Sequence, residues 1–268
     1  MTAGLRDALD TDGVVLCMAV QHFRSPVVPM VAATCGFDAV YVDLEHTALP
    51  LDAAADLCSA AVSAGIVALV RVSGHDASGI GRALDVGATG VIVPHIESAR
   101  QAADVVAAAH FPPTGRRSVS GPTAATGYGH RSVAEVMVAA RAFTSVTVMV
   151  ESRAGLSAVD EIAAVPGVDM ILLGANDLSL DLGVHEDFAS DVFDEAVCRV
   201  ADACRARGPA FGVAGVPAVD LLRRYVDRGL RFVSAGTDLG FMTVAAGDRV
   251  RTLRALDEAG TTRMTATR

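Results

Sequence analysis

The sequence contains no lysine at all, so its 22 basic residues are all arginines. A catalytic Schiff base, which requires a lysine side chain, is therefore excluded. Tryptophan is also absent and aromatic residues make up only 4% of the chain, whereas 51% of the residues are hydrophobic. The core must therefore be built mainly from small and branched aliphatic side chains, which suit the close packing of helices on strands.

The chain also lacks an excess of positive charge, because its formal net charge is −9. This balance argues against a nucleic-acid partner, which favours a basic surface, and against recruitment to an anionic membrane. No apolar run reaches the roughly 18 residues of a membrane-spanning helix, and residues 1–12 carry charges instead of a signal-type apolar stretch. The five cysteines form no C-x-x-C pair, so we expect buried free thiols and a cytoplasmic protein.

Short apolar runs rich in Val, Ile or Leu alternate along the chain with segments of helical periodicity. Such runs are typical of parallel strands that are buried on both faces. No G-x-G-x-x-G motif follows the first run, which argues against the competing doubly wound open sheet. Eight strands alternating with helices predict a (β/α)8 TIM barrel, formed as a single domain by residues 1–268. The runs cover residues 14–20, 39–43, 66–72, 90–94, 146–151, 168–173, 210–214 and 231–234.

Two segments depart from this alternation. Residues 110–130 are rich in proline and glycine and predict a long turn-rich loop, of a kind that is usually functional or forms subunit contacts. Residues 241–259 have a helical pattern and are followed by a polar tail, residues 260–268, which we expect to fray.

Charged side chains follow several of the predicted strands. In a (β/α)8 barrel the active site lies at the carboxyl ends of the strands. His46 follows the second run, Arg71 lies at the end of the third, His95 follows the fourth, Glu151 ends the fifth and Asp177 follows the sixth. Because charged groups are costly to bury unless they are paired or bound to a metal, this pattern favours a functional site over a set of structural ion pairs.

Glu151 and Asp177 come from neighbouring strands and suit one hard divalent cation, namely magnesium, manganese or cobalt. Such ions prefer oxygen ligands, and two protein ligands leave positions open for water and a bidentate substrate. No spacing of histidines and cysteines supports a tetrahedral zinc site. The cation would act as a Lewis acid on a carbonyl oxygen.

Three further side chains are candidates for catalysis at this rim. Arg71 offers a planar set of donors for a carboxylate or a developing enolate. His46 is the best candidate for a general base, because its ordinary pKa lies near neutrality. Asp85 is expected either to hold the His46 ring in one tautomer or to be a solvated carboxylate at a helix end. His95 is expected either to face the pocket or to pack, and Asp238 to cap a helix.

The order and spacing of short sequence blocks carry a resemblance to a known family. The chain resembles the metal-dependent 2-oxo acid aldolases of the HpcH/HpaI family over about residues 14–240, and residues 116–121 are similar to macrophomate synthase-like members. The matching blocks are Gly36-Phe37-Asp38, Asp43-x-Glu45-His46, Val70-Arg71, Arg82-Ala83-Leu84-Asp85-x-Gly87-Ala88, Gly90-Val91-x-Val93-Pro94, Phe111-Pro112-Pro113-x-Gly115-x-Arg117, Val150-Glu151-x-Arg153, Gly174-x-x-Asp177-Leu178-Ser179 and Gly236-x-Asp238.

This resemblance implies a function and an assembly. The function is that of a class II pyruvate-type aldolase, a lyase that cleaves or forms a 4-hydroxy-2-oxo acid through a metal-bound pyruvate enolate. Its partners would be a small 2-oxo acid and an aldehyde. The assembly would be a homo-oligomer, commonly a hexamer in relatives, in which the helix at residues 241–259 is exchanged between subunits.

The resemblance also implies a role for each candidate residue. It implies that Glu151 and Asp177 bind the metal and that His46 and Asp85 form the proton-transfer pair. It further implies that the substrate oxygens are held by Arg71 and by the backbone amides of Gly174, Ala175, Asn176 and Asp177.

Departures from the family pattern leave alternative functions open. Met149 stands where a glutamine is often found, His95 where an apolar residue is frequent, and Leu44 and Asn176 where small residues are common. These changes alter the pocket walls and not the metal ligands. The alternatives are an oxaloacetate decarboxylase or a citrate synthase-like or macrophomate synthase-like condensing enzyme on the same scaffold, and a non-catalytic barrel that binds a 2-oxo acid.

Overall fold

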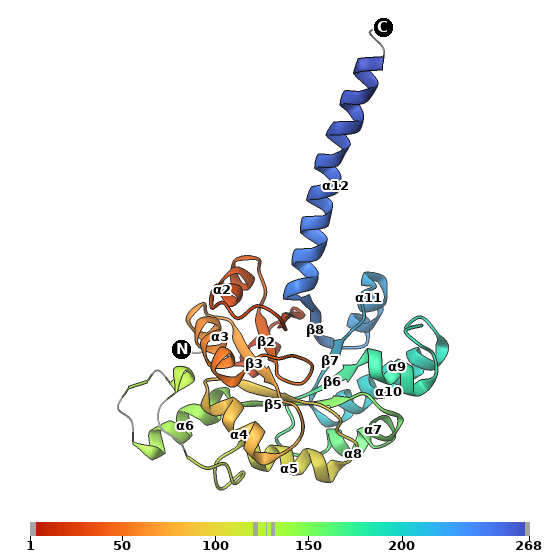
Figure 1. Ribbon diagram of the computed structural model, residues 1–268. Coiled ribbons are helices and arrows are strands. Elements are labelled where there is room, and N and C mark those ends of the chain that lie inside the picture. Colours follow the sequence, from red (N-terminus) through yellow and green to blue (C-terminus); the bar gives the residue numbers. More distant parts are fainter. Residues whose placement is uncertain (1–3, 120–122, 127, 130–131, 266–268) are drawn as a thin grey trace.

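The computed structural model describes residues 4–119, 123–126, 128–129 and 132–265, and within them the chain forms a closed barrel of eight parallel strands (Figure 1). Each strand pairs with the next in sequence order, and the last returns to the first. The strands closely follow the predicted apolar runs, so the expected single-domain (β/α)8 TIM barrel is confirmed. They are β1 (Val15–Val20), β2 (Ala39–Asp43), β3 (Val67–Arg71), β4 (Gly90–Val93), β5 (Ser145–Val150), β6 (Met170–Gly174), β7 (Ala210–Ala214) and β8 (Leu230–Thr237).

Helices surround the barrel and connect its strands (Figure 1). Several begin at a serine or aspartate whose side chain accepts a hydrogen bond from the first turn, as Asp76 and Ser98 do. The helices are α1 (Leu5–Leu9), α2 (Val27–Thr34), α3 (Leu51–Ser63), α4 (Ala77–Asp85), α5 (Ala99–Ala109), the 3-10 helix η1 (Ala124–Thr126), α6 (Val133–Phe143), α7 (Arg153–Ser157), α8 (Val159–Ala163), α9 (Ala175–Leu182), α10 (Asp191–Arg207), α11 (Val219–Asp227) and α12 (Asp238–Thr265).

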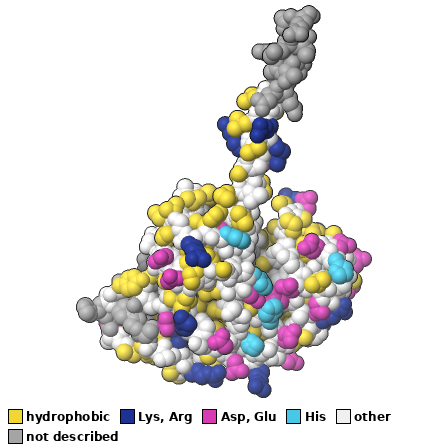
Figure 2. All heavy atoms as spheres, in the orientation of Figure 1, with side chains coloured by type: hydrophobic (Ala, Val, Ile, Leu, Met, Phe, Trp, Pro, Cys, Tyr) yellow, Lys and Arg dark blue, Asp and Glu magenta, His cyan; other side chains and the backbone are white. Residues whose placement is uncertain are grey.

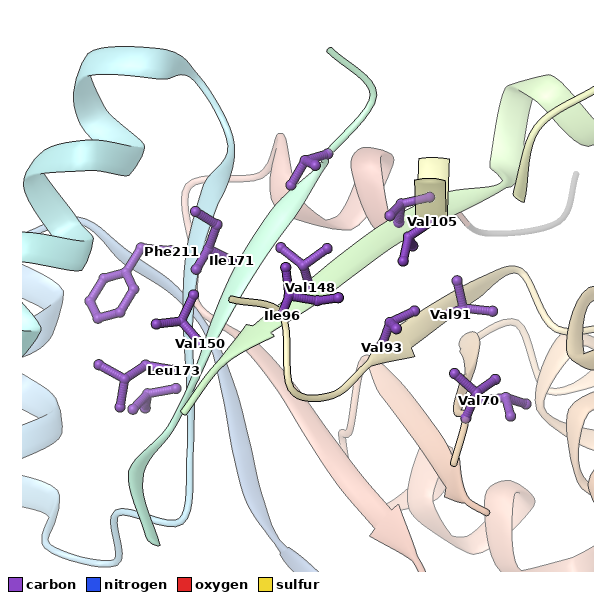
Figure 3. Close-up of a cluster of buried hydrophobic side chains, with 14 of the residues drawn as sticks. Val70, Val91, Val93, Ile96, Val105, Val148, Val150, Ile171, Leu173 and Phe211 are labelled. Carbon is purple, nitrogen blue, oxygen red and sulfur yellow. The ribbon is translucent and has the colours of Figure 1, made fainter. Parts of the chain in front are cut away.

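Two hydrophobic cores follow from the alternation of side chains along each strand. Outward-facing residues such as Val70, Val91 and Val148 pack against the helices, and Figure 3 shows part of this shell. Inward-facing residues of the strands, among them Leu69 and Leu172, form a smaller second core inside the barrel. The barrel is therefore a packed core and not a pore.

The inward alternation also decides which side chains reach the carboxyl end of the barrel. Residues 39 and 41 of β2, 67 and 69 of β3, 149 of β5, and 170 and 172 of β6 belong to the inner core. Two residues further along each strand stand Asp43, Arg71, Glu151 and Gly174. Because successive inward positions are two residues apart, these four residues form the uppermost layer of the barrel interior.

The cysteines are free thiols, as the sequence predicted, but not all of them are buried. Cys17, Cys58 and Cys204 are buried, whereas Cys35 is exposed and Cys198 is half-buried. Burial raises the pKa of Cys58 and of Cys204 to about 12, so neither is a nucleophile at neutral pH.

The turn-rich segment at residues 110–130 contains η1, but residues 120–122, 127 and 130 lie outside the described residues. The segment that follows it forms α6, a helix that we did not predict from the sequence. A capping box between Ser132 and Glu135 begins this helix, and its S-x-x-E spacing is visible in the sequence.

The last helix, α12, is longer than expected. We predicted a helix at residues 241–259 with a frayed polar tail, whereas α12 begins at Asp238 and continues to Thr265. It projects away from the barrel as a single rod (Figure 1). In the part of the chain that the structure describes, no helix is both long and apolar enough to cross a lipid bilayer.

Candidate active site

A cavity of about 500 Å³ opens at the carboxyl end of the barrel and gathers almost every predicted site residue. Figure 2 shows histidine and acidic side chains clustered on the surface below the foot of α12, where this end of the barrel lies. Of the predicted site residues, only Asp85 is missing from the lining of this cavity. The lining includes His46, Arg71, Glu151, Gly174, Ala175, Asn176 and Asp177, together with Gln21, Tyr41 and Met149.

Arg71 is held from the neighbouring strand by Asp43. The two residues are register partners on β3 and β2, and their side chains form two contacts, Nε to Oδ1 at 2.9 Å and NH2 to Oδ2 at 2.6 Å. The guanidinium also stacks over the Tyr41 ring, 5.7 Å from its centroid. Burial alone would raise the pKa of Asp43, but the Arg71 guanidinium outweighs it and holds that pKa below its ordinary value. Asp43 is a site residue to which sequence reasoning gave no role.

Asp43 also shapes the loop that carries His46. Its Oδ1 accepts a hydrogen bond from the backbone N–H of Glu45 at 3.0 Å, and a longer one from that of His46 at 3.4 Å. Its Oδ2 accepts from Gln21 Nε2 at 2.9 Å. One buried carboxylate therefore fixes both Arg71 and the chain direction at His46, whose side chain is 56% exposed at the cavity mouth.

Glu151 lies deeper, and its residue is only 5% exposed. Burial raises the pKa of its carboxyl group, the backbone N–H and ring of His95 offset part of this rise, and the nearby carboxylates of Glu45 and Asp177 add to it, so the pKa stays above its ordinary value. The absence of a side chain at Gly174 makes room for it, because a Cβ there would lie 2.6 Å from Glu151 Oε2. A carboxylate that the fold desolvates and places beside other carboxylates is one that a cation would stabilise.

The donor set fits a hard divalent cation. Four carboxylates, those of Asp43, Glu45, Glu151 and Asp177, share this part of the barrel end with the guanidinium of Arg71. Among the described residues, no three histidine, cysteine or acidic side chains converge as a ready-made metal cage. A cation here would therefore take two carboxylates from the protein and its other ligands from water and substrate, as magnesium and manganese commonly do.

The first turn of α9 supplies backbone donors to the same cavity. Gly174 precedes this helix without a capping side chain, and Ala175, Asn176 and Asp177 form its first turn. The N–H groups at the start of a helix have no partner within the helix and carry partial positive charge, which suits a substrate carboxylate. Asn176 packs over Gly215, where a Cβ would lie 2.9 Å from its Oδ1.

Asp85 lies away from this cavity. It ends α4, five residues before β4 begins, and therefore lies near the amino-terminal rim, whereas His46 follows the carboxyl end of β2. Its carboxylate pairs with Arg117 of the turn-rich loop at 2.8 Å, and Arg117 stacks on Phe111. Within one chain, the nearest ion-pair partner of His46 is Glu45, at 3.6 Å. The pairing of His46 with Asp85 stays a prediction.

The expected cap at Asp238 is wrong, because Asp238 is the first residue of α12 and the capping hydrogen bond runs from the backbone N–H of Gly240 to Thr237 Oγ1 at 3.0 Å. Asp238 is 5% exposed, and its Oδ1 accepts from the backbone N–H of Leu239 at 2.8 Å. Its other contacts are with the loop after β1, because the backbone N–H groups of His22 and Phe23 donate to its Oδ2 at 3.0 and 2.9 Å. Asp238 thus ties the start of α12 to the loop beside Gln21.

His95 has a role that the sequence left undecided. It follows β4 with a left-handed backbone (φ 57°), and its side chain is 58% exposed. Its Nδ1 lies 2.9 Å from Glu151 Oε1, and its Nε2 lies 2.9 Å from Glu45 Oε1. His95 therefore bridges two carboxylates of the site, although it does not line the cavity itself and instead faces a neighbouring hollow that it shares with His75.

Comparison with known proteins agrees with this geometry. The sequence model of the HpcH/HpaI aldolase/citrate lyase family matches residues 23–245. A 4-hydroxy-4-methyl-2-oxoglutarate aldolase of Chaetomium globosum is 35% identical over 90% of this chain and 91% of its own. A hydroxypyruvate/pyruvate aldolase of Chromohalobacter salexigens is 34% identical over 91% of this chain and 94% of its own. The crystal structure of an HpcH/HpaI aldolase from Desulfitobacterium hafniense is similar with a TM-score of 0.87 at 27% identity, and the match covers 94% of this chain and 96% of that one.

The matched segment contains every predicted site residue. Both relatives are aldolases, which confirms the prediction of a pyruvate-type carbon–carbon lyase and does not favour the decarboxylase or condensing-enzyme alternative. The family model matches most of the chain, and the barrel is similar to that of a solved member of the family. The chain therefore belongs to the HpcH/HpaI aldolase/citrate lyase family.

Proposed function

We propose that this protein is a divalent-cation-dependent aldolase that cleaves or forms a 4-hydroxy-2-oxo acid. One observation carries the proposal: the inward alternation of the strands brings Arg71, Glu151 and Gly174 to one cavity, with His46 and Asp177 at its mouth. Glu151 and Asp177 would hold magnesium, manganese or cobalt. When bound, the cation would supply Lewis acidity to the keto oxygen of the 2-oxo acid.

The side chains of the protein divide the remaining work. The first amides of α9 bind the substrate carboxylate. Arg71, held in place by Asp43, donates to the negative charge that develops on the 2-oxo acid as the carbon–carbon bond breaks. His46 accepts the proton from the hydroxyl group on the carbon that becomes the second carbonyl product. In the synthetic direction each step runs in reverse.

Cleavage of 4-hydroxy-4-methyl-2-oxoglutarate, the substrate named for one relative, tests this proposal. The reaction would yield two molecules of pyruvate, which lactate dehydrogenase reports through NADH oxidation. We expect EDTA to abolish turnover and MnCl₂ or MgCl₂ to restore it. Glu151→Gln and Asp177→Asn should stay folded, as thermal unfolding would show, but lose turnover at every metal concentration. Chelator-resistant turnover by Glu151→Gln would contradict the proposal.

The same site could generate its enolate by decarboxylation, so this alternative needs a direct comparison. Carbon dioxide release from oxaloacetate, measured beside pyruvate release from the hydroxy acid, separates the two reactions. An aldolase should give the higher kcat/KM with the hydroxy acid. A non-catalytic barrel would give neither reaction and no exchange of the pyruvate methyl protons with deuterated water.

We further propose that the protein is a homo-oligomer in which α12 packs against a neighbouring subunit. An apolar hollow of about 1100 Å³ lies between α2 and the start of α12, lined by Val31, Phe37, Phe241 and Val244 among others. Figure 2 shows hydrophobic side chains gathered over α2 at the foot of α12. Exposed apolar surface of this extent favours a protein–protein contact. Asp85 lies at the opposite rim of the barrel from His46. A contact between these two side chains would therefore have to form between two subunits.

Sedimentation velocity tests this assembly. Val31→Glu and Val244→Glu place a charge on the two sides of the hollow, at positions that are 53% and 64% exposed, and should shift the protein to smaller species. Val219→Glu, on α11 at a position that is 66% exposed, is the matched control and should leave the sedimentation coefficient unchanged. A wild-type chain that sediments as a monomer would contradict the proposal.

A further inference from the structure

The two ring nitrogens of His95 each contact a carboxylate, and an apolar side chain at this position would lack both contacts. The backbone N–H of His95 donates to Glu151 Oε1 at 2.7 Å, and its ring Nδ1 lies 2.9 Å from the same oxygen. The other carboxylate oxygen, Oε2, lies against Gly174 inside the cavity. The two oxygens of Glu151 are therefore unequal: one is occupied by His95, and the other remains on the side from which a cation would approach.

The far side of the ring is also held. His95 Nε2 lies 2.9 Å from Oε1 of Glu45, whose side chain is only 8% exposed. Glu45 Oε2 in turn lies 3.4 Å from Arg71 Nε. A continuous chain of contacts thus runs from Arg71 through Glu45 and His95 to Glu151.

We propose that His95 is a positioning residue that fixes the Glu151 carboxylate for cation binding and links it through Glu45 to Arg71. This inference rests on the proposed function, because it assigns a role toward the cation. A carboxylate already held in one orientation loses less freedom when it binds an ion. Partners that orient a metal ligand commonly contribute 10- to 100-fold to metal affinity.

The backbone conformation allows the ring to be removed cleanly. Glycine adopts a left-handed backbone without strain, so His95→Gly keeps the φ of 57° and the N–H bond to Glu151 while it deletes the imidazole. The ring is 58% exposed, so it contributes little packing. The matched control is His75→Ala. His75 lies in the β3–α4 loop and lines, together with His95, a hollow next to the active-site cavity.

The experiment measures binding of MnCl₂ alone to the metal-free full chain, by calorimetry and by the electron paramagnetic resonance signal of free manganese. We expect His95→Gly to raise the Kd about 10- to 100-fold. His75→Ala should bind as the wild type does. His95→Asn tolerates the same backbone and keeps one amide donor, so it should recover part of the lost affinity. Thermal unfolding would show that each variant is folded.

The outcomes separate this inference from the proposed function. A Kd for His95→Gly within twofold of the wild type, or a tighter one, would overturn the positioning role. If Glu151→Gln still loses manganese binding in that case, the proposed function stands. If the wild-type chain itself binds no manganese, or Glu151→Gln binds it equally well, the proposed function fails and the positioning role fails with it.

Discussion

Asp43 and Arg71, register partners on adjacent strands, form a two-point ion pair beneath the candidate active site. The Asp43 side chain is fully buried and that of Arg71 is 11% exposed. Removing one charge of such a pair leaves the other uncompensated in the interior. This pair therefore affects both the stability of the fold and the orientation of Arg71.

We expect Asp43→Asn to lower the free energy of unfolding by about 3 kcal/mol, because the Arg71 charge loses its main partner. Urea-induced unfolding followed by circular dichroism would measure the change. Asp220→Asn is the control, because Asp220 is 93% exposed and pairs with Arg223 one turn away; it should cause no measurable change. Equal stabilities of the wild type and Asp43→Asn would show that the pair contributes nothing net.

The same pair predicts a pH dependence of stability. Because Arg71 holds the pKa of Asp43 below its ordinary value in the folded state, the stabilisation is present above the unfolded pKa of about 3.9 and is lost as the pH falls through the lower folded pKa. The difference in unfolding free energy between the wild type and Asp43→Asn should be constant from about pH 7 to pH 5 and shrink below about pH 4. If the difference in unfolding free energy shrank as the pH rose, the predicted direction of the pH dependence would be wrong.

Gly174→Ala tests the space around Glu151. The added Cβ would lie 2.6 Å from Glu151 Oε2 and 2.9 Å from its Cβ, so the carboxylate must shift. Since displacements of about 1 Å in a catalytic site can cost about 100-fold in rate, we expect a loss of turnover of at least 10-fold. Steady-state kinetics at saturating MnCl₂ would measure it.

Gly81→Ala provides the matched glycine control for that experiment. Gly81 lies inside α4, and nothing stands within 4 Å of a Cβ built there. This variant should keep full turnover and gain about 0.5–1 kcal/mol of stability, because alanine favours the helix. Loss of turnover in both variants, or in neither, would contradict the cramped geometry inferred at Gly174.

His46→Gln tests the proton-transfer role. Removing a general base typically costs about 10²- to 10⁴-fold, so cleavage of the hydroxy acid should fall by that factor. Decarboxylation of oxaloacetate has no hydroxyl proton to remove and should change only a few-fold. The ratio of the two rates, measured on the same preparation, is the readout. An equal fall in both rates would assign His46 to positioning or binding instead.

Local patterns in the sequence predicted most of the fold. Buried parallel strands need continuous apolar runs, so residues 39–43 and 210–214 could be assigned to the residue. Elements whose pattern is weaker were misjudged. Helix α6 was not predicted despite its capping box. The predicted end of α12 at residue 259 was too early, because the polar residues that follow do not reveal that the helix continues.

The sequence by itself determined that Arg71 and Glu151 stand at strand ends and that Asp177 follows the end of a strand, because a strand must stop being apolar where it meets solvent or a site. Only the closed barrel decided their partners. Strand register placed Asp43 beside Arg71, and the left-handed turn after β4 set His95 between Glu45 and Glu151. The return of α4 to the opposite rim carried Asp85 away from His46. Such pairings depend on contacts between segments far apart in the chain, which local periodicity does not encode.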